Sequence, residues 1–225
     1  MVHHEQELLK LKGEMIQLWH LVIAQLHKSK QALLTLDMDM AREIIFTERR
    51  VNAFELNIDN ECENIFALLN PVAVDLRFVL AVLKINSNLE RTGDIAEGIA
   101  KFVLEADKPF DTKLLEVTQV LEMFEEAADM LIDLLKAFEE ENTKIARGIF
   151  KRDEFLNEIN MRANEVITEY ISSTPNNIGQ ALHILSTIRK LERVGDQSKN
   201  IGEEIIFYVE AKVLKHASQS TREDD

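Results

Sequence analysis

The chain is poor in residues that interrupt helices or crosslink a fold. Its 225 residues include 7 Gly, 3 Pro and one Cys. The lone cysteine, Cys62, excludes an internal disulfide, which fits an intracellular protein. No apolar run approaches the roughly 18 residues of a membrane-spanning helix, and the N-terminus lacks the apolar segment of a secretory signal. We therefore expect a cytoplasmic protein that meets a membrane only through its partners.

Positive charge is also scarce. The chain has 26 Lys and Arg against 40 Asp and Glu, so its formal net charge is -14. Such a surface repels the phosphate backbone of nucleic acid and attracts cations and basic protein surfaces. We expect no nucleic-acid partner.

The usual sequence marks of an enzyme are missing as well. The chain has no glycine-rich phosphate loop and no serine in a nucleophile elbow. Its histidines are scattered, and no Glu-x-x-His occurs, which argues against a ferritin-like di-iron oxidase. We predict no catalytic residues and no enzymatic activity.

What the chain does contain is helical periodicity along nearly its whole length. Apolar residues recur three or four positions apart, with short breaks that carry capping residues such as Asp37 or Asp39, Asn70-Pro71, Asp111 and Thr174-Pro175. The pattern predicts helices over residues 3–35, 38–69, 71–106, 111–140, 143–172 and 175–216. At 1.5 Å per residue each is about 45 Å long.

A five-residue phrase occurs twice. Glu90-Arg91-Thr92-Gly93-Asp94 returns as Glu192-Arg193-Val194-Gly195-Asp196, in both cases inside a predicted helix that opens with proline, at Pro71 or Pro175. The order of elements is therefore an internal repeat. It predicts an all-α fold of two pseudo-symmetric three-helix bundles, covering residues 1–106 and 107–225.

Each copy of the phrase places a glutamate and an aspartate one turn apart on one helix face, where like charges repel. Such a pair can face solvent, form ion pairs with a neighbouring helix, or share a cation. The interior glycine costs about 1 kcal/mol relative to alanine, which favours a site over a plain surface. Glu55 and Asp59 repeat the spacing on the preceding helix. Together with Glu90 and Asp94 they form a candidate oxygen-ligand site for Mg²⁺, Mn²⁺ or Fe.

The second copy differs. Where carboxylates are expected on the preceding helix, the sequence has Asn157, Asn160 and Asn164. Asparagine can ligate through its carbonyl oxygen but brings no charge. We expect the site at Glu192 and Asp196 to bind a metal less firmly than the first.

The segments around both phrases resemble the PhoU family of bacterial phosphate-signalling regulators. Residues 71–77, 83–85 and 89–96 are similar to the family's first repeat. Residues 191–204 and 206–209, followed by Lys215-His216, are similar to its second. The resemblance implies surface metal clusters, with iron or zinc the metals it favours. The ligands that it implies are Glu55, Asp59, Glu90 and Asp94 in the first repeat and Glu192, Asp196 and Asn200 in the second.

The resemblance also implies a function. Family members restrain the phosphate regulon, linking the ATPase subunit of the phosphate ABC transporter to the sensor histidine kinase, and they usually act as homodimers. We therefore expect a non-enzymatic signalling adaptor. Two alternatives are an accessory subunit of a low-affinity phosphate or cation transporter, and a metal-dependent enzyme or metal store. The clear phrase in both repeats favours the regulator.

Overall fold

The chain folds into long helices, as the periodicity predicts. The computed structural model describes residues 2–214, and no strand occurs among them. The first half consists of α1 (Val2–Thr35), α2 (Met38–Leu69) and α3 (Val74–Glu105). The second half consists of α4 (Thr112–Thr118), α5 (Val120–Glu140), α6 (Thr143–Ser173) and α7 (Ile178–Glu210), with one 3-10 turn, Pro175–Asn177, before α7. The all-α prediction is confirmed.

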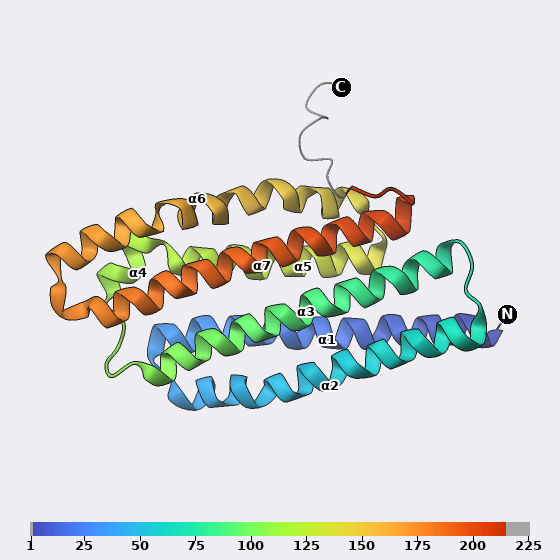
Figure 1. The fold of residues 1–225 in the computed structure, drawn as a ribbon, viewed down its shortest axis with the longest axis horizontal. Helices are drawn as coiled ribbons and strands as arrows, with labels where there is room; N and C mark the ends of the chain where they lie inside the picture. The colour runs from blue at the N-terminus through green and yellow to red at the C-terminus, as the bar shows by residue number, and fades with distance from the viewer. Residues whose placement is uncertain (1, 215–225) are drawn as a thin grey trace, which may run out of the picture.

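The two halves lie side by side with their long helices running along the same axis (Figure 1). α1 packs against α5, and α3 packs against α7, so the two helices that carry the repeated phrase meet at the centre of the molecule. None of the helices within residues 2–214 has the length and apolar character required to cross a bilayer.

Aromatic side chains join the halves. The indole N–H of Trp19 donates to the carbonyl oxygen of Leu131 at 3.0 Å, and its ring lies 5.5 Å from that of Phe138. Phe138 in turn stacks on Phe78 and meets Tyr208 edge to face. The expected boundary at residues 106 and 107 falls in the connection between α3 and α4, but the buried apolar residues form one core that continues across it.

Asn70-Pro71, which the sequence predicted as the start of a helix, lies at the end of α2. Asn70 closes α2 in the left-handed conformation, with φ 46° and ψ 59°, and α3 begins only at Val74. Asparagine tolerates this conformation, and proline is common just after such an end because it cannot continue the helix. The prediction that a helix starts at Pro71 is therefore wrong by three residues.

Three other predicted boundaries also differ. The expected helix 111–140 is interrupted at Gln119, whose φ of 53° ends α4 before α5 begins at Val120. Pro175 opens the short 3-10 turn and α7 begins at Ile178. α7 ends at Glu210, where Ala211 turns left-handed; residues 215 and 216 of the predicted helix lie outside the described part of the chain.

Candidate metal centre

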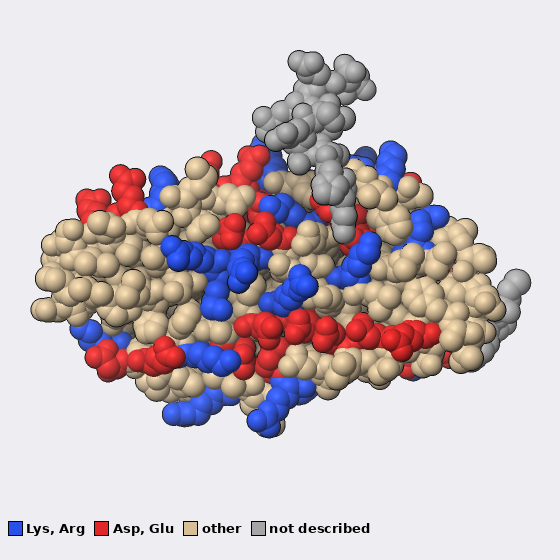
Figure 2. All heavy atoms as spheres, viewed as in Figure 1, with Lys and Arg blue, Asp and Glu red and all other residues tan. Residues whose placement is uncertain are grey.

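The four predicted carboxylates of the first repeat come together along the seam between α2 and α3. Burial raises the pKa of Glu55, and the neighbouring charges of Asp59 and Asp94 raise it further. The pKa of Glu90 is raised by burial, then by Asp94 and Glu55. Figure 2 shows a band of acidic side chains along these helices. The sequence thus predicted a real electrostatic cluster.

The cluster is not a finished coordination set. Within residues 2–214, no three Asp, Glu, His or Cys side chains are arranged as a ready metal site. Asp59 instead accepts a hydrogen bond from the amide of Asn86 at 2.9 Å, and the same amide donates to the backbone carbonyl of Glu55. Binding an ion here would require these side chains to change rotamer.

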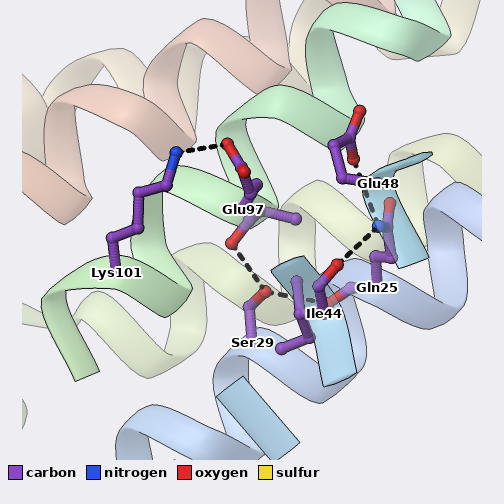
Figure 3. A network of polar contacts seen from close by, with 7 residues as sticks. Gln25, Ser29, Ile44, Glu48, Glu97 and Lys101 are labelled. Atoms are coloured by element: carbon purple, nitrogen blue, oxygen red, sulfur yellow. Dashed lines mark hydrogen bonds and ion pairs between the residues drawn. The ribbon is translucent and has the colours of Figure 1, made fainter. Parts of the chain in front are cut away.

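A fifth carboxylate, which we did not predict, lies deeper. Glu48 of α2 is only 4% exposed and its side chain rests on the bare backbone of Gly93, where an added Cβ would lie 2.9 Å from its Oε2. The amide of Gln25 donates to Oε2 at 3.2 Å (Figure 3). Burial raises the pKa of Glu48 to about 7, and the charges of Asp94, Glu97 and Glu90 act in the same direction. The interior glycine of the phrase therefore makes room for a carboxylate.

Several buried side-chain oxygens of the first repeat lack hydrogen-bond donors. Among the described residues, Oε1 of Glu48, Oε1 of Gln25 and Oδ1 of Asn86 are buried and accept no hydrogen bond. A buried acceptor without a donor costs about 1–3 kcal/mol. Together with carboxylates that raise one another's pKa, these oxygens fit a cation. The donors are all carboxylate and amide oxygens, which suit Fe, Mn²⁺ or Mg²⁺ better than a nitrogen- or sulfur-preferring zinc site.

The second repeat has the same architecture with a cation already built in. Asp153 of α6 is buried against Gly195, as Glu48 is against Gly93. The ammonium of Lys199 lies 2.7 Å from Oδ2 of Asp153 and 2.8 Å from Oδ1 of Asp196. Burial alone would lower the pKa of Lys199, but the hydrogen bonds to these two carboxylates raise it.

The charge at this position is reversed between the repeats. Lys199 follows Asp196 by three residues, and Glu97 follows Asp94 by three, so an ammonium in one repeat replaces a carboxylate in the other. Glu97 is held by Lys101 of its own helix (Figure 3). The first repeat therefore concentrates negative charge that the second repeat neutralises internally.

The remaining predicted residues of the second repeat are occupied differently. Burial raises the pKa of Glu192, followed by the charges of Asp196 and Asp153. Asn200 donates to Oδ1 of Asn88 at 3.2 Å, across the contact between α7 and α3. Asn157 donates to Asp153 at 2.6 Å. Asn200 and Asn157 therefore already have protein partners.

Sequence reasoning missed Glu48 and gave Asp153 no specific role, although a signal existed for each. Glu48 interrupts the buried apolar stripe formed by Ile44, Val51 and Ile58 of α2. Asp153 lies in the same way within a stripe of buried apolar residues on α6. A charged residue at such a position is rarely buried without a specific partner, and in both repeats its position matches an interior glycine of the phrase.

A known domain family matches both halves of the chain. The PhoU domain model matches residues 15–103 and 120–205. A Thermotoga maritima protein named phosphate-specific transport system accessory protein PhoU homolog 1 is 28% identical over 215 residues, covering 95% of this chain and 92% of the relative.

Solved structures agree. The crystal structure of PhoU from Pseudomonas aeruginosa has a TM-score of 0.84 at 26% identity and covers 92% of this chain and 99% of that one. The phosphate transport system regulatory protein PhoU from Streptococcus pneumoniae has a TM-score of 0.81 at 29% identity, covering 93% and 98%. With both repeats matched over most of their length, the chain belongs to the PhoU family.

Proposed function

We propose that this chain is a non-enzymatic regulatory accessory protein of phosphate uptake. The match of both repeats to the PhoU domain carries the proposal. Relatives that align along more than nine-tenths of the chain bear names of accessory or regulatory proteins of phosphate transport.

In this proposal the chain is a cytoplasmic adaptor. It docks on the ATPase subunit of the phosphate ABC transporter and on the sensor histidine kinase, and it holds the kinase in its non-signalling state. A net charge of -14 favours docking to basic surfaces. The turn between α2 and α3 exposes apolar side chains, with Leu68 73%, Val72 71% and Val74 57% exposed, as at a protein-docking surface. We propose that the working form is a homodimer.

Deleting the gene tests the adaptor proposal. We expect high expression of the phosphate regulon in phosphate-rich medium, because nothing then holds the kinase silent. A reporter fused to a regulon promoter measures this, and the wild-type gene supplied on a plasmid should restore repression. Normal repression in the deletion strain would contradict the proposal. A tagged chain should also recover the transporter ATPase and the kinase from membranes solubilised in mild detergent.

We further propose that the first repeat binds a metal ion, iron in preference to zinc, with Mn²⁺ or Mg²⁺ served by the same oxygens. The ion's ligands would be Glu55, Asp59, Glu90 and Asp94. The buried carboxylate of Glu48 would balance part of its charge. The ion would order the seam between α2 and α3, where like charges otherwise repel. The second repeat would bind little metal, because the ammonium of Lys199 already neutralises the carboxylates there.

Replacing Glu90 and Asp94 together by alanine should lower metal affinity by about tenfold or more while leaving the helical circular-dichroism spectrum intact. Elemental analysis after dialysis against limiting metal measures the loss. The matched control is Glu165→Ala with Glu169→Ala, an exposed pair with the same spacing on α6. Unchanged metal content in the first variant would exclude these two residues as ligands.

The same assay has an expected pH dependence. The folded pKa of Glu48 is raised to about 7, so below that pH its carboxyl holds a proton that a cation must displace. Wild-type metal affinity should therefore rise as pH increases through 7. Glu48→Gln should flatten this part of the profile.

A further inference from the structure

The arginine of the repeated phrase opposes the rise in pKa of the neighbouring glutamate, Glu90 or Glu192, and it also lines a second feature of the molecule. Arg91 and Arg193 occupy equivalent positions in the two repeats, and both line one open groove of about 670 Å³ where α3 lies against α7. Lys101 and Lys190 line the same groove. Figure 2 shows Lys and Arg side chains gathered along the middle of this face, beside the acidic band. The pseudo-symmetry thus brings the two arginines to one place.

Three of these cations have no ion-pair partner within residues 2–214. Lys101 is paired with Glu97, whereas no carboxylate among the described residues lies within ion-pair distance of Arg91, Lys190 or Arg193. The chain has a large excess of acidic residues over basic ones. Three cations without a direct ion pair on one concave surface can take up a further negative charge.

Lys190 is placed in the groove by its surroundings. Its side chain passes over Gly98 so closely that an added Cβ there would lie 3.0 Å from its Cε. Its ammonium lies 5.8 Å from the ring centre of Phe102. Arg193 and Lys101 line the same groove, so the ammonium of Lys190 shares it with two further cations.

We propose that this groove binds a small anion carrying two or more linked phosphate groups, with Arg91 and Arg193 taking its phosphoryl oxygens and Lys190 adding a point charge. Guanidinium groups bind phosphate oxygens in a planar, two-point manner. The volume exceeds what one orthophosphate needs and falls in the range of small-molecule sites.

The carboxylates of the groove refine the ligand. Asp94, Glu97 and Glu105 line its α3 side, so a bare anion would be repelled there. Di- and triphosphates carry Mg²⁺ in water, and Mg²⁺ is commonly held by one or two carboxylates together with ligand phosphates. In the magnesium complex of such a ligand, the phosphates would meet the cations of the groove and the Mg²⁺ would meet its carboxylates. The inference rests on the charges of the groove and is independent of the proposed role in phosphate uptake.

Isothermal titration calorimetry of the full chain tests the proposal. In buffer with Mg²⁺, pyrophosphate and ATP should each bind with one site per chain, and adenosine and sulfate should not. Similar affinities for pyrophosphate and ATP would mean that the linked phosphates alone account for binding. A tighter complex with ATP would mean that the groove also recognises the nucleoside. Absence of heat from both phosphates at millimolar concentration, or equal binding of adenosine, would overturn the proposal.

Variants separate the groove from general charge. Arg91→Gln with Arg193→Gln should weaken pyrophosphate binding by about tenfold or more, since each lost charged contact matters. Arg189→Gln is the matched control, because Arg189 is exposed on the same helix, outside this groove, and bonds to Asn164. Gly98→Ala should weaken binding by displacing Lys190, with little change in the melting temperature. Equal affinity in the wild type and the double arginine variant would refute the site.

Discussion

Lys199→Met should lower the free energy of unfolding by about 2–3 kcal/mol, which is less than the loss of one partner from a fully buried ion pair because Lys199 is itself 30% exposed. Asp153 keeps only 3% of its side chain exposed, and the Lys199 ammonium lies 2.7 Å from its Oδ2. Methionine fills a similar volume but carries no charge. The carboxylate would then remain between α6 and α7 with the amide of Asn157 as its remaining side-chain donor among the described residues. Urea denaturation followed by circular dichroism measures the loss.

Two further variants show whether the loss comes from the buried charge. Lys28→Met breaks a pair with Glu43 in which both side chains are about half exposed, at 42% and 57%, and it should cost less than about 0.5 kcal/mol. Adding Asp153→Asn to Lys199→Met should recover most of the stability, because no unpaired charge stays buried. If Lys199→Met costs no more than Lys28→Met, the ammonium is not the internal cation of the second repeat.

The contrast between the repeats marks the limit of what the sequence could predict about the site. Helix geometry fixes a common face for Glu90 and Asp94, and another for Glu55 and Asp59. That the two pairs meet could be predicted only by assuming that α2 and α3 pack as neighbours. Which residue lies opposite an interior glycine depends on how two helices cross. The contact of Glu48 with Gly93, and the link from Lys199 to Asp153, therefore required the tertiary structure.

The fold shows a similar division. Helix existence and order follow from apolar periodicity. Asp111 caps its helix as predicted, and of the two candidates Asp37 and Asp39 it is Asp37 whose side chain accepts from a backbone N–H. The ends were less predictable. Asn70-Pro71 fits both a helix start and a helix stop, and only the left-handed backbone at Asn70 decides between them. Gln119 adopts a positive φ without the glycine that would have signalled the break between α4 and α5.

Trp19→Ala should destabilise the whole chain, by about 3–5 kcal/mol, because a large side chain leaves a cavity at the junction of the halves. Trp19 is fully buried; its indole donates to Leu131 of α5 and its ring packs on Phe138. Since α1 shares this contact with α5, loss of the ring should weaken both halves together. Thermal unfolding followed by circular dichroism should show one transition, moved as a unit to lower temperature.

The form of the transition decides between one folding unit and two. Independent halves would leave part of the helical signal melting at the wild-type midpoint, because the second half would keep its own core. Trp19→Phe is the control: it retains most of the ring contact with Phe138 and loses only the hydrogen bond to Leu131, so it should cost about 1–2 kcal/mol. Both variants should show a single transition, with the midpoint lowered more in Trp19→Ala than in Trp19→Phe. That result would mean that the repeats, although duplicated in sequence, depend on each other for stability. A signal bound to one repeat could then alter the other through the core that they share.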